Sequence, residues 1–217
     1  MGQAEEASSA PYPELDITIV KDDLVRGIRD IYNEYNEKTF GTIKGEGFYT
    51  RHDWCRIDYV FSDLVQRGGS ILDVGVGAGQ LLHTYNKSGA FTKIAGADIV
   101  RHTRFYDPED ELRVYFMDVS QLLFADNSFD VVTCMEVLEH IPEASFIKAL
   151  KQLRRVAKKQ LIMTVPFNEP EPLPSFHLQR FDEEKIERYF PDAKKLIMYK
   201  YKRAGVPWLV LQEFFDS

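Results

Sequence analysis

Apolar positions between residues 70 and 166 gather into short runs, and segments with helical spacing separate several of them. The runs of strand length are Ser70–Val74, Lys93–Asp98, Leu112–Met117, Phe129–Met135 and Gln160–Val165. The helical segments in this region are Gln80–Asn86 and, more clearly, Glu143–Ala157. Buried strands that alternate with helices are typical of a parallel sheet covered on both faces. The pattern therefore predicts an α/β fold.

The chain on either side of this region carries further helical and strand patterns. They predict helices over Asp22–Glu37, Asp53–Gln66 and Asp182–Phe190, and a hairpin of strands over Lys194–Tyr201 and Val206–Phe214. Residues 1–13 are small, polar and interrupted by proline, and we expect a loosely held lead-in there. We expect one domain over residues 1–217, in which about 14–67 form a helical cap or lid and 68–217 form the core.

Composition and charge narrow the classes of protein to which the chain can belong. The 217 residues include 27 Lys and Arg against 34 Asp and Glu, a net charge of -7, so a global basic field for nucleic acid is absent. Two cysteines are too few for a disulfide scaffold. No apolar stretch approaches the roughly 18 residues of a membrane span, and Met1–Glu6 lacks the order of a signal peptide. We expect a cytoplasmic protein with no membrane contact.

The most informative stretch joins the first of these strands to the helical segment after it. Its sequence is Ile-Leu-Asp-Val-Gly-Val-Gly-Ala-Gly-Gln, from Ile71 to Gln80. Glycines in such a turn let the backbone pass close to a ligand, and the following helix offers unpaired N–H groups. A nicotinamide-binding turn requires a small residue where Gln80 stands, which argues against a dehydrogenase.

With Asp73 placed two residues before Gly75, this stretch resembles the class I S-adenosylmethionine-dependent methyltransferases, in their small-molecule branch. Three later segments fall into the same register: Gly96–Ile99, Phe116–Val119 and Phe124–Ile141. The resemblance implies a three-layer Rossmann-like sandwich whose mostly parallel, seven-stranded sheet ends in an antiparallel hairpin. It also implies S-adenosyl-L-methionine as cofactor and S-adenosyl-L-homocysteine as product. One departure is that Ile99–Pro108 is short and holds few helical signals, so we expect the usual helix after the second strand to be reduced or missing.

The resemblance assigns cofactor contacts residue by residue. An acidic residue at the end of a strand can accept hydrogen bonds from both ribose hydroxyls, a role that falls to Asp98. Asp118 would accept from the adenine amino group. Helix capping is the alternative for both, and stabilisation of the turn is the alternative for Asp73. The expected contacts are Asp73, Val74, Gly75, Val76, Gly77, Gly79, Asp98, Ile99, Asp118, Val119 and Met135, with Tyr49 and Arg51 closing over the cofactor from the cap.

Candidate catalytic residues follow the fourth and fifth strands of the core. Glu136, Glu139 and His140 share one face if a helical turn forms there, and His177 lies in a proline-rich loop. We expect a general base among these four and no metal. The alternative is a divalent-metal triad of Glu136, Glu139 and His140 with His177 as a fourth ligand, as the resemblance to ubiquinone-pathway and small-RNA 2′-O-methyltransferases implies. Both histidines could also be structural.

We therefore expect transfer of a methyl group to a small-molecule acceptor, preferably an oxygen because imidazoles and carboxylates gather near the site. An N-methyltransferase, an RNA 2′-O-methyltransferase with a metal and a non-catalytic partner subunit are the alternatives. RNA could use a basic run at near-helical spacing, although a solvated helix face is the expected role of these residues: Lys148, Lys151, Arg154, Arg155, Lys158 and Lys159. Nucleic acid is not an expected partner, and the oligomeric state and the acceptor are left open.

Overall fold

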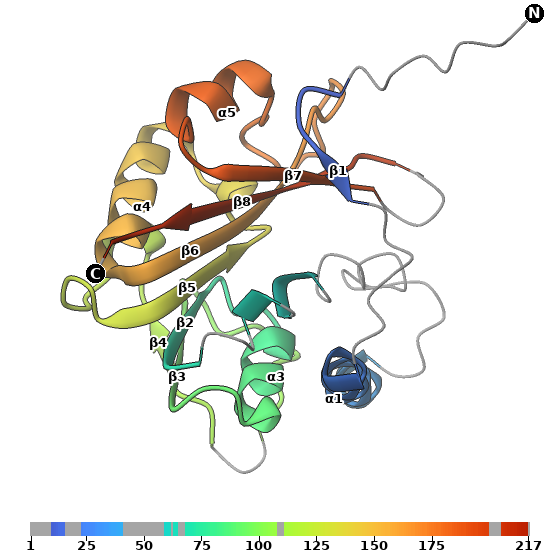
Figure 1. Ribbon diagram of the computed structural model, residues 1–217, viewed down its shortest axis with the longest axis vertical. Coiled ribbons are helices and arrows are strands. Elements are labelled where there is room, and N and C mark those ends of the chain that lie inside the picture. Colours follow the sequence, from blue (N-terminus) through green and yellow to red (C-terminus); the bar gives the residue numbers. More distant parts are fainter. Residues whose placement is uncertain are drawn as a thin grey trace, which may run out of the picture.

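Eight strands form one sheet in the part of the chain that the structure describes, in the order β1-β7-β8-β6-β5-β2-β3-β4 (Figure 1). The structure is a computed structural model that describes residues 10–15, 23–40, 59–61, 63–64, 68–107, 111–199 and 205–216. The strands are β1 Glu14–Leu15, β2 Ser70–Val74, β3 Lys93–Asp98, β4 Val114–Phe116, β5 Phe129–Met135, β6 Ala157–Pro166, β7 Lys194–Met198 and β8 Trp208–Phe214.

Helices connect these strands and cover the sheet. They are α1 Asp23–Phe40, α3 Gln80–Ser88, α4 Glu143–Val156 and α5 Glu183–Tyr189, with short 3-10 turns η2 Val119–Gln121 and η3 Leu138–His140. Residues 59–61 and 63–64 are also helical, in agreement with the predicted second helix, while the rest of that helix lies outside the described residues. No helix of the described segments combines the length and the apolar character that a membrane span requires.

Strand directions confirm the predicted fold. Strand β8 pairs antiparallel with both β6 and β7, whereas every other described pair is parallel. Strand β1 is an addition to the seven predicted strands. Its Glu14 and Leu15 pair with Ile197 and Met198 at the edge of the sheet. Two residues carry no periodic signal, so their pairing depends on contacts made elsewhere in the fold, such as the packing of Tyr12 on Phe167 with ring centroids 5.6 Å apart.

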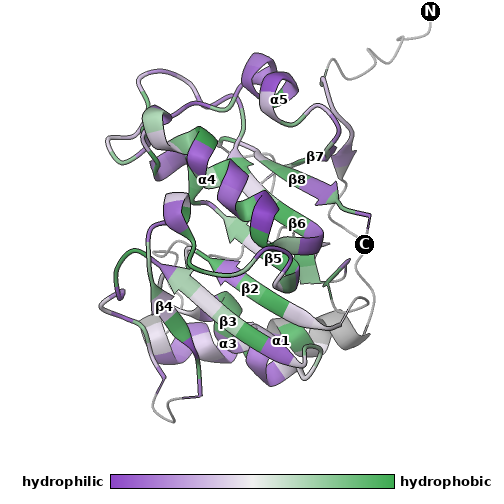
Figure 2. Cartoon of the chain, turned by 90° about the vertical axis from the view of Figure 1, so that its left-hand side faces the viewer, coloured by the Kyte–Doolittle hydropathy of each residue, from purple (hydrophilic) through white to green (hydrophobic). Residues whose placement is uncertain are grey.

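The core lies on both faces of the sheet and accounts for the apolar strands. Leu72 and Val74 of β2 belong to the cluster under α4 and α5, whereas Ile71 belongs to the cluster on the opposite face, which includes Leu81 of α3. Alternate side chains of a strand point to opposite faces, so a strand covered on both sides must be apolar throughout. Figure 2 shows green, hydrophobic stretches along β2, β5 and β6, interrupted by single polar positions. The three layers are those that the sequence predicts.

The connection from β3 to β4 contains no helix in its described residues, 99–107 and 111–113. The Asp107 carboxylate accepts hydrogen bonds from the N–H groups of Glu111 (3.1 Å) and Leu112 (2.9 Å), which fixes the end of this loop. The predicted loss of the usual helix is thus confirmed for these residues. The loop itself covers part of the sheet face that a helix covers elsewhere in the fold.

Candidate functional site

The glycine-rich turn between β2 and α3 depends on backbone conformations that favour glycine. Gly75, Gly77 and Gly79 have φ angles of 83°, 54° and 92°, in the left-handed region that is costly for other residues. The Gly75 N–H donates to the Ala97 carbonyl at 2.8 Å, which ties the turn to β3. The turn therefore reaches the carboxyl ends of β2 and β3 together.

The three glycines differ in what a side chain would meet. A Cβ at Gly75 would lie 2.1 Å from Val137, and one at Gly79 would lie 2.8 Å from the Tyr35 hydroxyl, so protein atoms exclude side chains at both. A Cβ at Gly77 would meet no protein atom within 4 Å. This is the cradle that a bound ligand would fill. The space beside the turn thus fits a nucleoside cofactor at Gly77, while the requirement for Gly75 has a different cause.

Asp98 lies at the end of β3 and faces this cradle. Its Oδ2 accepts a hydrogen bond from the Gly77 N–H at 2.8 Å, and its Oδ1 accepts from Val100 at 3.3 Å. The carboxylate thus holds the turn and stays next to the space where ribose hydroxyls would lie. Asp118, at the end of β4, is exposed, and its Oδ1 caps η2 through the Ser120 N–H at 2.7 Å. The Oδ1 atom of Asp118 therefore has the helix-capping role that was considered as the alternative to adenine binding.

Asp73 is buried beneath the turn. Its Oδ1 accepts a hydrogen bond from the Thr133 hydroxyl at 2.8 Å, and its Oδ2 has no hydrogen-bond partner among the described residues. Burial raises the pKa of this carboxyl to about 7; the Thr133 hydroxyl opposes the shift and the charge of Asp98 adds to it. A carboxyl with this pKa changes charge near neutral pH, directly below the predicted cofactor site.

The raised pKa of Asp73 predicts how stability depends on pH. The folded carboxyl holds its proton up to a pKa of about 7 instead of 3.8, so the native state binds more protons than the unfolded state between these values. The stability associated with this proton is present below the unfolded pKa and is lost as pH rises through the folded pKa. Relative to Asp73→Asn, the cofactor-free parent should lose on the order of 2–4 kcal/mol in unfolding free energy between pH 4 and 8. Urea melts of both proteins measure the difference, and a pH-independent difference would contradict this assignment.

The other predicted cofactor contacts divide into buried and exposed residues. Val74, Val76 and Met135 are buried in the apolar clusters, so only their backbones remain for a ligand. Ile99 is 67% exposed and follows Asp98, and Val119 is half-buried at the start of η2. These two offer apolar surface at the ends of β3 and β4. Tyr49 and Arg51 lie outside the described residues.

Tyr35 of α1 is a contact to the turn that the sequence analysis missed. Its buried hydroxyl hydrogen-bonds the Ala78 carbonyl at 2.7 Å and the Tyr106 carbonyl at 2.9 Å, and accepts the Tyr106 N–H at 3.1 Å. One side chain of the cap thus joins the glycine turn to the loop after β3. The residue looked like one of many apolar positions on a helix, and the sequence held no further signal for this role.

Glu136 does not share a face with Glu139 and His140, contrary to the expected helical turn. Its φ of 56° turns the chain directly after β5, and its Oε2 accepts a hydrogen bond from the Trp208 indole N–H at 2.9 Å. The 3-10 turn η3 begins only at Leu138. Glu136 therefore faces β8, and the alternative triad of Glu136, Glu139 and His140 does not form.

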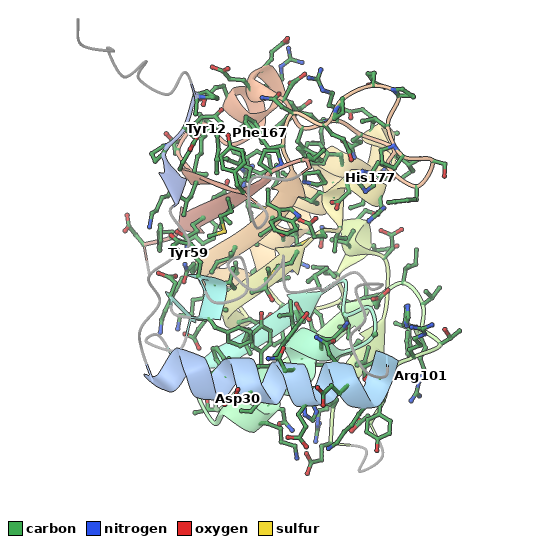
Figure 3. All side chains as sticks on the ribbon, turned by 90° about the vertical axis from the view of Figure 1, so that its right-hand side faces the viewer. Tyr12, Asp30, Tyr59, Arg101, Phe167 and His177 are labelled. Atoms are coloured by element: carbon green, nitrogen blue, oxygen red, sulfur yellow. The ribbon has the colours of Figure 1, made fainter. Side chains whose placement is uncertain are left out.

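His177, and not Glu136, lies next to Glu139 and His140. Ligand atoms of Glu139, His140 and His177 all lie within 4.8 Å of one another. Glu139 is 1% exposed, and its backbone carbonyl accepts the Leu178 N–H at 2.7 Å, which ties the proline-rich loop to η3. Figure 3 labels His177 on that loop. The structure thus brings together three of the four predicted catalytic residues.

Hydrogen bonds fix the orientation of both imidazoles. The Nδ1 of His140 lies 2.8 Å from the Phe176 carbonyl, which can only accept, so this nitrogen carries the proton. The Nδ1 of His177 lies 2.6 Å from Oε2 of Glu169, and an N–H donating to the carboxylate satisfies both groups. In the neutral rings each Nε2 then keeps its lone pair. The two lone pairs and the Glu139 carboxylate can accept a proton or bind a cation.

Glu169 is a site residue that sequence reasoning missed. It is buried, and its contact with His177 spans eight positions within one loop. The loop closes at its base, where the Asn168 N–H donates to the Phe181 carbonyl at 2.9 Å. The only signal was an acidic residue among prolines ahead of a histidine, which many exposed loops also contain.

A divalent metal fits the Glu139, His140 and His177 donor set by chemistry. Imidazole nitrogens and a carboxylate oxygen suit zinc, manganese or iron, and metal-bound histidines usually donate their other N–H to a carboxylate or carbonyl. The contacts of His140 with Phe176 and of His177 with Glu169 have this form. The cluster is therefore able to serve either as a proton acceptor or as a metal site.

Comparison with known proteins matches the central part of the chain to one family. Residues 72–163 match the family described as methyltransferase domain. The ubiquinone biosynthesis O-methyltransferase of Xanthomonas oryzae pv. oryzae is 36% identical over 116 residues, which cover 51% of this chain and 48% of that protein. The chain thus spans about half the length of the curated relatives it matches.

Solved structures agree with the fold over a larger part of the chain. A S-adenosylmethionine-dependent methyltransferase from Archaeoglobus fulgidus has a TM-score of 0.59 at 15% identity, over 84% of this chain and 99% of its own. The 1,6-didemethyltoxoflavin-N1-methyltransferase of Burkholderia thailandensis, solved with S-adenosylhomocysteine, has a TM-score of 0.57 at 15% identity, over 94% of each chain. The predicted resemblance is confirmed at the level of the fold and of residues 72–163.

Proposed function

We propose that this chain, which has the fold of the class I S-adenosylmethionine-dependent methyltransferases, transfers a methyl group from S-adenosylmethionine to an oxygen of a small-molecule acceptor. The cluster of Glu139, His140 and His177 carries this proposal. A hydroxyl acceptor must lose its proton during transfer, and a neutral imidazole Nε2 is a suitable proton acceptor. The name of the matched Xanthomonas relative, an O-methyltransferase, supports the same type of acceptor.

Different residues at the carboxyl ends of the parallel strands contact the cofactor and the acceptor. Bound S-adenosylmethionine supplies a methyl group that is activated by its sulfonium. Gly77 leaves room for it, and the Asp98 carboxylate lies where it would hold the ribose of its nucleoside part. On the acceptor side, the Nε2 of His177 takes the hydroxyl proton. The buried Glu139 carboxylate then stabilises the positive charge that forms on the imidazole.

The arrangement of the strands also indicates where the acceptor binds. Ends of parallel strands meet at one edge of the sheet, so the acceptor lies beyond β5 and β6 next to the cofactor. We propose that cap residues of about 14–67 and the loop from Pro166 to Phe181 shape the acceptor pocket within a single domain over 1–217. The described part of the cap already contacts the turn through Tyr35. We also propose a cytoplasmic location for the protein.

A metal-assisted form of the reaction is the second candidate, and the 4.8 Å cluster favours it. Glu139, His140 and His177 would hold the ion, which would lower the pKa of a bound hydroxyl acceptor. This set replaces the predicted alternative of Glu136, Glu139 and His140. Activity that survives EDTA and does not respond to added Co²⁺ assigns proton removal to an imidazole. Loss on chelation with recovery on Co²⁺ addition assigns it to a metal.

Replacing Glu169 with glutamine tests how His177 is oriented. The amide no longer offers a charged acceptor to Nδ1–H, so the fixed tautomer should give way to a mixture. Long-range ¹H–¹⁵N NMR of the full chain reports the tautomer directly. If the cluster binds Co²⁺, its affinity should fall roughly 10- to 100-fold.

The matched control is Glu171→Gln in the same loop. The exposed Glu171 accepts the Leu173 N–H at 3.1 Å and does not reach His177. It should leave the tautomer and any Co²⁺ affinity unchanged. An unaltered His177 spectrum in Glu169→Gln would remove the orienting role.

RNA is not the acceptor that we propose. Half of the basic run that could bind RNA makes contacts within the protein. Arg154 pairs with Glu213, Arg155 donates to the Leu122 and Phe124 carbonyls, and Lys159 pairs with Asp130 at 2.8 Å. Arg154, Arg155 and Lys159 are thus occupied within the protein and not simply solvated as predicted, and Lys158 and Lys159 belong to β6 instead of the predicted helix face.

The proposed function is tested with labelled S-adenosylmethionine and a panel of small phenols, catechols, aliphatic alcohols and amines. We expect S-adenosylhomocysteine production with hydroxyl acceptors, and NMR of the product should show an O-methyl ether. Methylation of amines alone would replace the proposal by N-methyl transfer. Binding of S-adenosylhomocysteine without turnover on any member would favour a partner subunit that lacks catalysis.

A further inference from the structure

Strand β4 ends the sheet on the side away from β1, and no described strand pairs with its outer edge. Its three residues pair with Gly96, Ala97 and Asp98 of β3 on the inner side only. A free strand edge offers unpaired N–H and C=O groups to another chain, and proteins usually protect it with charge, proline or a covering element. Figure 2 shows β4 at this margin of the sheet.

Large apolar side chains are exposed along this edge. Phe116 of β4 is 55% exposed, Tyr115 beside it is 43% exposed, and Leu123, in the segment after η2, is 76% exposed. Val100, on the loop after β3, is 63% exposed. Single exposed apolar residues are common, but such a group around one free edge marks a contact surface.

A hollow lies next to β4 on each face of the sheet. On the α3 side, Val114 and Phe116 line a cavity of about 120 Å³ together with Val100. On the α4 side, Tyr115 lines a groove of about 550 Å³ together with Leu123. Alternate residues of β4 thus face the two hollows. A strand added to this edge would send its own alternate side chains into both.

The first hollow is a consequence of the short β3–β4 connection. Residues 99–107 contain no helix, and Phe105 of this loop contributes one wall of the cavity. Gly77 and Asp98 form the end of the cavity nearest the cofactor site. An occupant that enters beside Val114 would therefore lie next to the cofactor site. Its own contacts would be with β4 and not with Gly77 or Asp98.

Charges around the edge indicate the nature of the occupant. Lys93 and Arg113 line the α4-side groove with no acidic residue among its described lining, and Arg101 lines the other hollow. Figure 3 labels Arg101 at this side of the molecule. That cavity also contains two carboxylates, Asp98 and Asp107. The basic part of the edge is therefore the rim of the α4-side groove, on a chain of net charge -7.

A second copy of the chain is the alternative occupant of this edge. Two β4 strands paired about a two-fold axis run antiparallel, so Lys93 and Arg113 of the two copies would lie at opposite ends of the pair. An acidic segment of a different protein meets the same edge with charge complementarity. The exposed β4 offers three residues for pairing, so a short segment is sufficient.

We propose that the free edge of β4 binds an extended segment of another protein, in which a short apolar run is flanked by acidic residues. The run would pair with Val114–Phe116 as an added strand and fill the hollows on both faces, while the flanks meet Lys93, Arg101 and Arg113. The observations behind this site do not involve the acceptor or the methyl-transfer chemistry.

The test uses the full chain saturated with S-adenosylhomocysteine and the fluorescein-labelled peptide EEVFVEE. Two control peptides are KKVFVKK, with reversed charge, and EEVPVEE, whose proline removes a backbone N–H and opposes pairing. Fluorescence polarisation should show EEVFVEE binding at least about tenfold more tightly than either control. Hydrogen exchange of the β4 amides should slow when EEVFVEE is bound.

Variants locate the contact. Tyr115→Lys and Leu123→Lys should each weaken EEVFVEE binding about tenfold or more, and Leu123 lies in a loop where the change does not endanger folding. Arg113→Glu should shift preference toward KKVFVKK. Ile147→Lys is the matched control, because Ile147 on α4 is 59% exposed, between Tyr115 at 43% and Leu123 at 76%; binding should not change.

Several results would overturn the proposal. They are equal binding of the three peptides, no binding of EEVFVEE at millimolar concentration, or equal weakening by Ile147→Lys. A dimer in analytical ultracentrifugation that Tyr115→Lys dissociates would assign the edge to a second copy instead. Retained S-adenosylhomocysteine affinity in the variants separates this site from the cofactor site.

Discussion

Gly77→Val should abolish measurable binding of S-adenosylhomocysteine, with a loss of affinity of at least about 100-fold. Gly77 has open space in place of protein atoms where its Cβ would lie, and its N–H donates to Asp98 at 2.8 Å. A valine side chain would enter the space assigned to the cofactor. The positive φ of 54° adds backbone strain of roughly 1–2 kcal/mol. Isothermal titration calorimetry measures the loss.

Gly89→Val is a closely matched control for this change. Gly89 caps the other end of α3 with a φ of 66°, and its Cβ would also meet no atom within 4 Å. Both variants should therefore lose similar folding stability, while only Gly77→Val loses the ligand. If both bind S-adenosylhomocysteine equally well, the cofactor does not lie over Gly77. Gly75→Val is less informative, because its clash with Val137 disturbs the fold itself.

His177→Ala should lower the rate constant of methyl transfer roughly 10²- to 10⁴-fold, the usual contribution of a general base. The substitution removes the imidazole, one nitrogen of which lies within 4.8 Å of the Glu139 and His140 ligand atoms. It leaves the glycine turn and Asp98 untouched, so affinity for S-adenosylhomocysteine should stay within about twofold. Single-turnover measurements with an accepted hydroxyl substrate separate the chemical step from binding.

Two outcomes would contradict the role of His177. A variant that retains its rate shows that the ring is structural. A variant that loses cofactor affinity in proportion to its rate shows that the proline-rich loop supports the cofactor. The loop is tied to η3 through the Glu139 carbonyl and Leu178, independently of the His177 side chain, so a general collapse is not expected. An unfolding temperature equal to that of the parent protein would verify that the fold of the variant is intact.

The strands were predictable because their apolar character comes from burial on both faces. The observed bounds of β2, β3 and β5 are the predicted ones. Each strand lies inside the sheet, and a glycine or an acidic residue marks its end. Strand β6 begins earlier than expected, at Ala157, because Lys158 and Lys159 extend the strand with exposed side chains. The glycine turn and the acidic residues at the strand ends were predictable for a similar reason, since they lie in one register along the sequence.

The catalytic side was less predictable because it depends on backbone torsion and on contacts between loops. Spacing placed Glu136 with Glu139, but a φ of 56° turns Glu136 to Trp208. His177 joined the cluster through a loop whose path the sequence did not fix. Its partner Glu169 is determined by that path as well. Such pairings are products of tertiary structure, and no local pattern encodes them.

The Tyr35 hydroxyl couples two parts of the protein that the sequence keeps far apart. It hydrogen-bonds Ala78 in the glycine turn and Tyr106 in the loop after β3, while its ring belongs to α1. Docking of α1 and order in the turn are therefore expected to be coupled, and whatever cofactor binding gains from a docked α1, the docking of α1 gains from bound cofactor. Proteolysis of α1 should consequently slow as the turn fills. The cap would then respond to cofactor occupancy, in addition to its proposed place beside the acceptor.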